Sequence, residues 1–103
     1  MIVEERTYHV HTGRLADVVE LYEHGTTLQQ EVLGQLIGAF TVDIGDLSSI
    51  VQLWGYVSLE ERDRRRADLA SRAEWKELLQ KLQPLIHTQR NRILVPTSFS
   101  PIR

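Results

Sequence analysis

Ile50-Val51-Gln52-Leu53-Trp54-Gly55-Tyr56-Val57 is the stretch of this sequence that decides the fold. Its β-branched and aromatic residues are typical of a strand, and alternate residues of a strand point to opposite faces. One face carries the larger side chains of Ile50, Gln52, Trp54 and Tyr56. The other face carries the smaller side chains of Val51, Leu53, Gly55 and Val57. A strand with one solvated face would alternate apolar and polar residues. We therefore expect this sheet to be buried on both faces.

The segments before this stretch predict two more strands and a helix. Residues 35–44 form a second apolar run, and the turn residues at 45–49 predict a hairpin between the two runs. Residues 2–10 are rich in β-branched and aromatic side chains, which predicts a strand. Apolar side chains recur at helical spacing from residue 15, with Gly25 expected to interrupt this helix and Gly34 to end it.

The segments after this stretch predict a helical region and one more strand. Ser58-Leu59-Glu60-Glu61 has the form of a capping box, which predicts that a helix begins there. An apolar stripe follows at helical spacing, and Pro84 should kink or split the helix that carries it. Residues 92–95 predict the last strand. The stripe consists of Trp75, Leu78, Leu79, Leu82, Leu85 and Ile86.

The order of these segments defines the fold class. Strand, helix, strand, strand, helix, strand predicts an α+β, ferredoxin-like βαββαβ fold, in which an antiparallel sheet has its helices on one face. A length of 103 residues and a hydrophobic content of 42% fit one domain. We expect that domain to span 1–103, with 96–103 as an extended C-terminal tail.

Composition and motifs exclude several classes of chemistry. The absence of cysteine removes disulfides, thiolate metal sites and a cysteine nucleophile. No phosphate-binding glycine loop and no Gly-x-Ser-x-Gly elbow occurs. The first residues lack a signal-peptide pattern, and no apolar run is long enough to cross a membrane. We expect a cytoplasmic protein with no membrane partner.

Charge is divided unevenly along the chain. Residues 1–51 hold two basic and eight acidic residues, whereas residues 52–103 hold ten basic and six acidic residues. The basic excess includes the arginines of 62–66, but acidic side chains lie four residues from several of them, as neighbours on one helix face do. This pattern favours an ion-paired, exposed helix face over a nucleic-acid partner. For Arg62, at the start of the helix, a surface position is favoured, and the alternative is that it points inward.

The second apolar face of the sheet needs a cover. Low side chains suit the packing of two sheets about 10 Å apart, and two-fold pairing of identical patches is the commonest assembly. We therefore predict a homodimer, and the alternative is a monomer whose tail folds over its own sheet. The candidate interface residues are Thr7, Ala39, Thr41, Val51, Leu53 and Gly55.

The face with the large rings is the candidate ligand site, because small-molecule pockets combine apolar walls with a few polar groups. Arg6 would hold an anion there, since its guanidinium matches a carboxylate. The alternative is that Glu4 and Arg6 pair with each other and the rings form ordinary core. No catalytic residue is assigned. The candidate ligand-binding residues are Glu4, Arg6, Tyr8, Phe40, Gln52, Trp54 and Tyr56.

The histidines offer at most part of a metal site. His9 and His11 lie on one side of a strand end, but a metal would need further ligands. Nothing in the spacing brings His87 or Glu5 to them. We expect no metal and no cofactor.

Short motifs occur in order along essentially the whole chain: Glu5-Arg6-Thr7-Tyr8, Gly13-Arg14-Leu15, Leu53-Trp54-Gly55-Tyr56 followed by Ser58-Leu59, Glu74-Trp75, Asn91-Arg92-Ile93-Leu94 and Phe99-Ser100-Pro101. In this succession they resemble the NIPSNAP family. The resemblance implies a dimeric α/β barrel, in agreement with the two-sided strands, and it implies no catalytic residues. Glu5 departs from the leucine-like residue of the family. The wider group with this architecture includes cofactor-independent oxygenases and haem proteins whose ligands lie between sheet and helices.

Two functions stay open on this basis. The first is a homodimer that binds a small, partly apolar molecule, an anion among the options, with or without cofactor-free oxygenase or isomerase chemistry. The second is a non-catalytic interaction or scaffold domain. A polar-lined cavity between sheet and helices would favour the first, whereas a space filled by Trp54, Tyr56 and Leu82 would favour the second.

Overall fold

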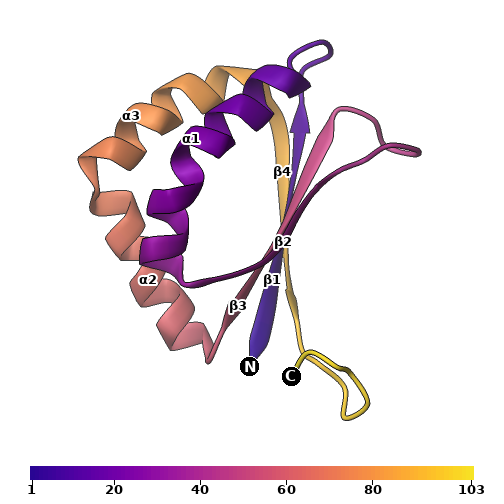
Figure 1. The fold of residues 1–103 in the computed structure, drawn as a ribbon, viewed down its shortest axis with the longest axis vertical. Coiled ribbons are helices and arrows are strands. Elements are labelled where there is room, and N and C mark those ends of the chain that lie inside the picture. The colour runs from indigo at the N-terminus through magenta and orange to yellow at the C-terminus, as the bar shows by residue number, and fades with distance from the viewer.

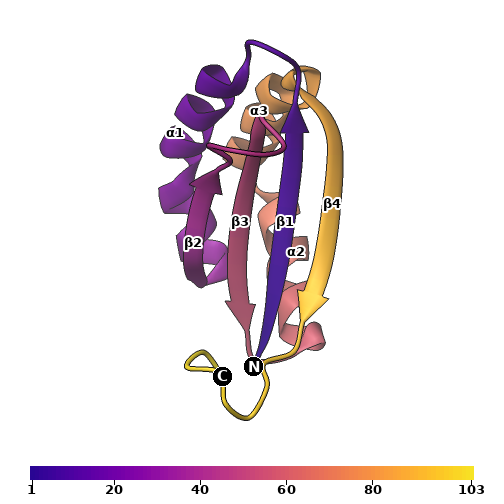
Figure 2. The ribbon, with the colours of Figure 1, turned by 90° about the vertical axis from the view of Figure 1, so that its right-hand side faces the viewer.

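The computed structural model describes all of residues 1–103 and confirms the α+β, ferredoxin-like fold (Figure 1). Four antiparallel strands form one sheet in the order β2-β3-β1-β4. The strands are β1 (Ile2–Val10), β2 (Gln35–Thr41), β3 (Ser49–Tyr56) and β4 (Ile86–Leu94). The helices are α1 (Leu15–Leu33), α2 (Leu59–Ser71), α3 (Ala73–Leu82) and the short 3₁₀ helix η1 (Gln83–Leu85). All helices cover one face, and Figures 1 and 2 show the other face open.

Helix α1 continues through Gly25, so the predicted interruption is wrong. Gly25 is buried, and a Cβ at this position would meet the side chain of Leu78 in α3. The glycine is therefore a point of close helix–helix approach, and packing outweighs its poor helix propensity. Gly34 ends the helix as predicted, with a φ of +95° that favours glycine.

Helix α2 begins at the predicted capping box. The backbone N–H of Glu61 donates to Oγ of Ser58 at 3.1 Å. The Glu61 carboxylate accepts in return from the backbone N–H of Val57 at 2.6 Å. Two backbone donors at the helix start are thus satisfied by side chains.

Strand β4 begins earlier than the sequence predicts. Helix α3 ends at Leu82, and Pro84 lies in η1, where its missing N–H costs no helical hydrogen bond. Ile86 therefore starts the strand and pairs with Val10 of β1, whereas the sequence pattern places it on the helical stripe. Residues 87–91, which follow Ile86, are polar and lack the alternation typical of a strand. They form a strand because they pair with β1.

Strand β2 contains a β-bulge between Leu36 and Gly38 that reverses the faces of the residues after it. Leu36 lies opposite Trp54 and faces the helices as expected. Phe40, however, lies opposite Val51, on the open face. One extra residue in a strand moves every later side chain to the other face.

Three predicted positions are wrong because of this bulge. The sequence predicts Phe40 under the helices, but its ring lies over Gly38 on the open face, 2.6 Å from where a Cβ of that glycine would lie. The sequence predicts Ala39 and Thr41 on the open face, but they lie opposite Gln52 and Ile50 and face the helices.

The core lies between the sheet and the helices, around the fully buried side chains of Trp54, Leu69 and Leu82. The tail does not cover the open face: in Figure 2 it lies beyond the lower ends of the strands. Its Phe99 side chain is 86% exposed. No helix has the length and apolar character that crossing a membrane requires.

Candidate functional site

A buried carboxylate surrounded by arginines lies between β1 and α2. The Glu4 side chain has no exposed surface, and its Oε2 accepts from Nη2 of Arg62 at 2.6 Å. Nη1 of Arg6 lies 3.2 Å from the same oxygen. Nη2 of Arg66 lies 3.4 Å from the other carboxylate oxygen. One carboxylate therefore faces three guanidinium groups.

Local geometry brings these groups together. Glu4 and Arg6 are two residues apart on β1, so they share the face that the helices cover. Arg62, Arg66 and the buried Leu69 follow one another at i, i+4, i+7 on the inner side of α2. The prediction that Arg62 lies at the surface is therefore wrong, because its position on this stripe turns it toward Glu4.

The electrostatics of Glu4 follow from its neighbours. Burial alone would raise the pKa of the Glu4 carboxyl, but the hydrogen bond from Arg62 and the charges of Arg6 and Arg66 outweigh burial and lower the pKa. Arg62 also pairs with Asp63 at 2.9 Å. The excess positive charge therefore lies with Arg6 and Arg66. Nε of Arg66 is buried without a hydrogen-bond acceptor, and Nη2 of Arg66 faces only Oε1 of Glu4, at 3.4 Å.

Two tyrosines stand beside the arginines. Nε of Arg6 donates to the hydroxyl oxygen of Tyr8 at 2.7 Å. The rings of Tyr8 and Tyr22 lie 5.8 Å apart, between centroids. Burial, together with the neighbouring Tyr8, raises the pKa of the Tyr22 phenol far above its ordinary value. The Tyr22 hydroxyl is therefore protonated over the whole physiological range.

One cavity, which we name the arginine cavity, has a volume of about 490 Å³ and lies between α2, α3 and the strands β1 and β4. It is lined by Arg6, Tyr8, Tyr22, Arg66, Leu69, Ala70, Trp75, Leu79, Gln83, Ile86, His87, Thr88 and Gln89. Most of the β4 residues among them are exposed, so the cavity opens past this edge strand.

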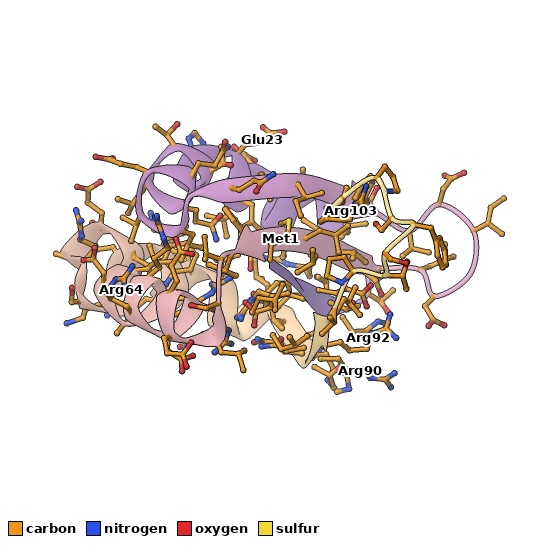
Figure 3. The ribbon with its side chains drawn as sticks, turned by 90° about the horizontal axis from the view of Figure 1, so that it is seen from below. Met1, Glu23, Arg64, Arg90, Arg92 and Arg103 are labelled. Atoms are coloured by element: carbon orange, nitrogen blue, oxygen red, sulfur yellow. The ribbon has the colours of Figure 1, made fainter.

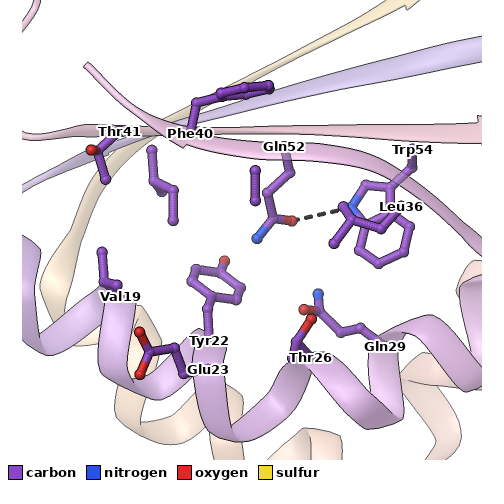
Figure 4. A pocket seen from close by; sticks show the side chains of 12 residues that line it. Val19, Tyr22, Glu23, Thr26, Gln29, Leu36, Phe40, Thr41, Gln52 and Trp54 are labelled. Carbon is purple, nitrogen blue, oxygen red and sulfur yellow. Dashed lines mark hydrogen bonds between the residues drawn. The ribbon is translucent and has the colours of Figure 1, made fainter. Parts of the chain in front are cut away.

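The second cavity, which we name the amide cavity, has a volume of about 290 Å³ and lies between α1 and the strands β2 and β3 (Figure 4). Its lining residues are Val19, Tyr22, Glu23, Thr26, Gln29, Leu36, Ala39, Phe40, Thr41, Ile50, Gln52 and Trp54. Ala39 and Thr41 are exposed, so it opens past the other edge strand.

The structure divides the predicted ligand-binding residues between these cavities. Arg6 and Tyr8 line the arginine cavity, whereas Gln52 and Trp54 line the amide cavity. Phe40 lies at the edge of the amide cavity, and its ring points away from it (Figure 4).

Glu4 and Tyr56 line neither cavity. Glu4 lies beneath the arginines, and the buried Tyr56 hydroxyl has no hydrogen-bond partner. Arg66, Tyr22 and Gln29 also line the cavities, although the sequence pattern did not predict them. The inward stripe that Arg66 shares with Leu69 could have revealed it.

The histidines lie closer together than the sequence indicates. The ring of His87 is 5.1 Å from that of His11 and 6.2 Å from that of His9, between centroids. The bend of β4 around the end of β1 brings them there, which corrects the expectation that His87 stays apart. No group of three or more side chains in the structure could hold a metal ion.

The open face contains four of the predicted interface residues: Thr7, Val51, Leu53 and Gly55. Glu5, on the same face, pairs with Arg92 of β4 at 2.8 Å. Figure 3 shows Arg90 and Arg92 on the side of the sheet away from the helices. The open face thus combines an apolar centre with a charged margin along β4.

Comparisons with known proteins agree with this fold. A model of the NIPSNAP family matches residues 3–101. A NIPSNAP family protein from Agrobacterium tumefaciens is 44% identical, with a TM-score of 0.97 over 99% of this chain and 98% of that one. An uncharacterized NIPSNAP-like domain protein from Burkholderia xenovorans is 47% identical, with a TM-score of 0.93 over 97% of this chain and 88% of that one.

Other similar proteins share less sequence with this chain or are much longer than it. The protein NipSnap homolog 2 of Mus musculus is 28% identical over 102 residues, which are 99% of this chain and 36% of that protein. The chain thus spans about a third of the length of such curated relatives. A putative antibiotic biosynthesis monooxygenase from Nitrosomonas europaea shares the fold, with a TM-score of 0.72 and 9% identity over 93% of this chain and 98% of that one. On the match over residues 3–101, the chain belongs to the NIPSNAP family.

Proposed function

We propose that this protein binds a small organic anion in the arginine cavity. The observation that carries the proposal is the charge balance around Glu4: Arg6 and Arg66 share one carboxylate, and the buried Nε of Arg66 has no acceptor. A buried cation without a full partner is unfavourable, and a bound anion removes that cost.

The rest of the cavity favours an anion with an apolar body. Trp75, Leu79 and Ile86 supply apolar walls, while Tyr8 adds a hydroxyl close to the Arg6 guanidinium. This combination of apolar walls with a few convergent polar groups is usual for small-molecule sites. A guanidinium pair suits a carboxylate or a phosphate monoester.

The homodimer is part of the same proposal. The centre of the open face is apolar, no helix covers it, and Phe40 is 55% exposed there. A second copy of the chain, pairing face to face, would bury this surface. Sedimentation at micromolar concentration tests it: a species of twice the chain mass is expected, and a monomer would overturn this part.

Calorimetric titration with benzoate tests anion binding, with benzyl alcohol as the neutral probe of similar shape. Benzoate is expected to bind and benzyl alcohol to bind at least tenfold more weakly, because charge-assisted hydrogen bonds contribute about 1.5–3 kcal/mol. Arg66→Met should lower the affinity for benzoate by about tenfold. Equal affinities for benzoate and benzyl alcohol would contradict the proposal.

The chain offers a matched control on the same helix. Arg64 is exposed on the outer side of α2, away from the cavity (Figure 3). Arg64→Met removes the same charge without touching the cavity, so benzoate affinity should stay close to that of the unchanged protein. An equal loss in both variants would indicate a long-range charge effect instead of a site.

The proposal stops at binding. The likeness to antibiotic biosynthesis monooxygenases concerns the fold alone, at 9% identity. Neither cavity holds a nucleophile paired with a base, and the Tyr22 phenol keeps its proton.

A further inference from the structure

We infer that the amide cavity is a second binding site, and that it takes an uncharged, flat, largely apolar molecule with a carbonyl group. The inference goes beyond anion binding in the arginine cavity, because different side chains carry it. Gln52 and Gln29, on opposite walls, supply its hydrogen-bonding groups.

The amide of Gln52 is held in one orientation. Nε1 of Trp54 donates to Oε1 of Gln52 at 3.1 Å, which occupies the amide oxygen. The amide nitrogen is thereby left as a donor, and Figure 4 shows it pointing into the space between the strands and α1. Gln52 is only 3% exposed, so bulk water has little access to this donor.

Gln29 faces it from α1. Its side chain is 2% exposed, and the bond from Trp54 to Gln52 is the one hydrogen bond drawn among the lining residues in Figure 4. Buried polar groups are nearly always hydrogen-bonded, to protein, water or ligand. The free amide groups of Gln52 and Gln29 are not among the fully enclosed atoms that lack a partner, so they remain accessible from the cavity and can bind a polar group there.

The lining of the amide cavity favours an uncharged, apolar ligand. Trp54, Leu36 and Ile50 supply apolar walls. Figure 4 shows the Tyr22 ring on α1, facing the strands across the cavity. No arginine, lysine or histidine lines the cavity, and the exposed carboxylate of Glu23 lies on its rim. An anion therefore gains nothing here, whereas a carbonyl oxygen can accept from the Gln52 amide.

The two tryptophans of the chain make the sites separately observable. Trp54 lines the amide cavity and Trp75 lines the arginine cavity. Each indole N–H gives its own signal in a ¹H–¹⁵N spectrum, and Trp75→Phe assigns the two. Occupation of the amide cavity should move the Trp54 signal and leave the Trp75 signal in place, whereas an anion at Arg66, whose guanidinium lies 5.9 Å from the centroid of the Trp54 ring, should move both.

The test titrates the full chain with 1-indanone and with 1-methyleneindane, which has a CH₂ in place of the carbonyl oxygen. 1-Indanone should shift the Trp54 signal in a saturable way, and 1-methyleneindane should bind about tenfold more weakly, as expected for one lost hydrogen bond in a buried site. Benzoate should move the Trp75 signal, so failure of one site is distinguishable from failure of the other.

Variants of the glutamines complete the test. Gln29→Met keeps the side-chain size, breaks no hydrogen bond within the chain and should weaken 1-indanone at least threefold. Gln52→Met should weaken it about tenfold, although it also leaves the Trp54 indole without its acceptor. Gln80→Met, at an exposed position of α3, is the control and should change nothing. Equal affinity for the two probes, or no saturable shift of the Trp54 signal up to the solubility limit, would overturn the inference.

Discussion

Arg62 donates from Nη2 to the carboxylate of Glu4 at 2.6 Å, although 58 residues separate the two in the sequence. The contact joins β1 to the first turn of α2, across the core. It fixes a charged group in a place where most proteins of this size have only apolar side chains. The first predictions concern this contact.

Glu4→Gln should destabilise the fold by about 3–5 kcal/mol at pH 7, since it leaves three guanidinium groups without their carboxylate. Urea unfolding of both proteins measures the difference. Asp63→Asn, which removes an exposed partner of Arg62, is the control and should cost less than about 1 kcal/mol. Equal losses in the two variants would contradict a special role of Glu4.

The same pair predicts a pH dependence. The folded protein lowers the pKa of Glu4 below its unfolded value of about 4.3, so the stabilisation is complete above about pH 5 and is lost as pH falls through the folded pKa. The difference in unfolding free energy between the unchanged protein and Glu4→Gln should therefore be constant from about pH 5 to 8. It should narrow below about pH 4. A difference that is unchanged at about pH 3 would contradict the lowered pKa.

Gly25 and Leu78 should show strong coupling in a double-mutant cycle. Gly25→Ala places a methyl group against Leu78, so it should destabilise the unchanged protein by about 1–3 kcal/mol. In a Leu78→Ala background the clash is gone, and the same change should stabilise the helix by up to about 1 kcal/mol. Thermal unfolding measures all four proteins, and additive effects would contradict the close approach.

Phe40→Arg should dissociate the proposed homodimer without unfolding the chain. Phe40 is 55% exposed in the single chain, so arginine is tolerated there, whereas two copies would bring the charges into one interface. Sedimentation should show a monomer, with an unchanged circular dichroism spectrum. Ile44→Arg, at a position 89% exposed in the β2–β3 connection, should leave the assembly as it is. A dimer that persists in the Phe40→Arg protein would place the interface elsewhere.

Ser58→Ala should cost about 1 kcal/mol, because the backbone N–H of Glu61 then loses its acceptor at the start of α2. Ser71→Ala, whose hydroxyl donates to the backbone of Asp68 at an exposed helix end, should cost clearly less. Urea unfolding checks both. An equal loss of unfolding free energy in the two variants would indicate that the Ser58 cap does not stabilise α2.

Much of the fold follows from local patterns. The hairpin, the capping box at Ser58 and the shared face of Glu4, Arg6 and Trp54 were all predictable, because alternation and capping act over a few residues. The shared face also confirms the strand parity predicted for β1 and β3, whereas the parity predicted for β2 is wrong after its bulge.

What the sequence did not predict depends on contacts between distant segments. Helix α1 passes through Gly25 because α3 packs there, and β4 extends back to Ile86 because β1 pairs with it. Arg66 lies within an arginine run that also fits an exposed face. Its spacing from Leu69 indicates the inner side of α2, but only the packing of α2 against β1 places it next to Glu4. A site formed by a helix and a strand depends on how the two pack against each other. The spacing of residues within either element does not give that information.

The bulge in β2 has a consequence for how relatives are aligned. A relative that lacks a residue at the position of Ile37 would lose the bulge and keep the later side chains on the faces that they occupy here. A relative of equal length without the bulge would instead exchange the side chains that border the amide cavity with those on the open face. A single-residue gap here is therefore compatible with unchanged surfaces, and residue roles should be transferred separately from each side of the bulge.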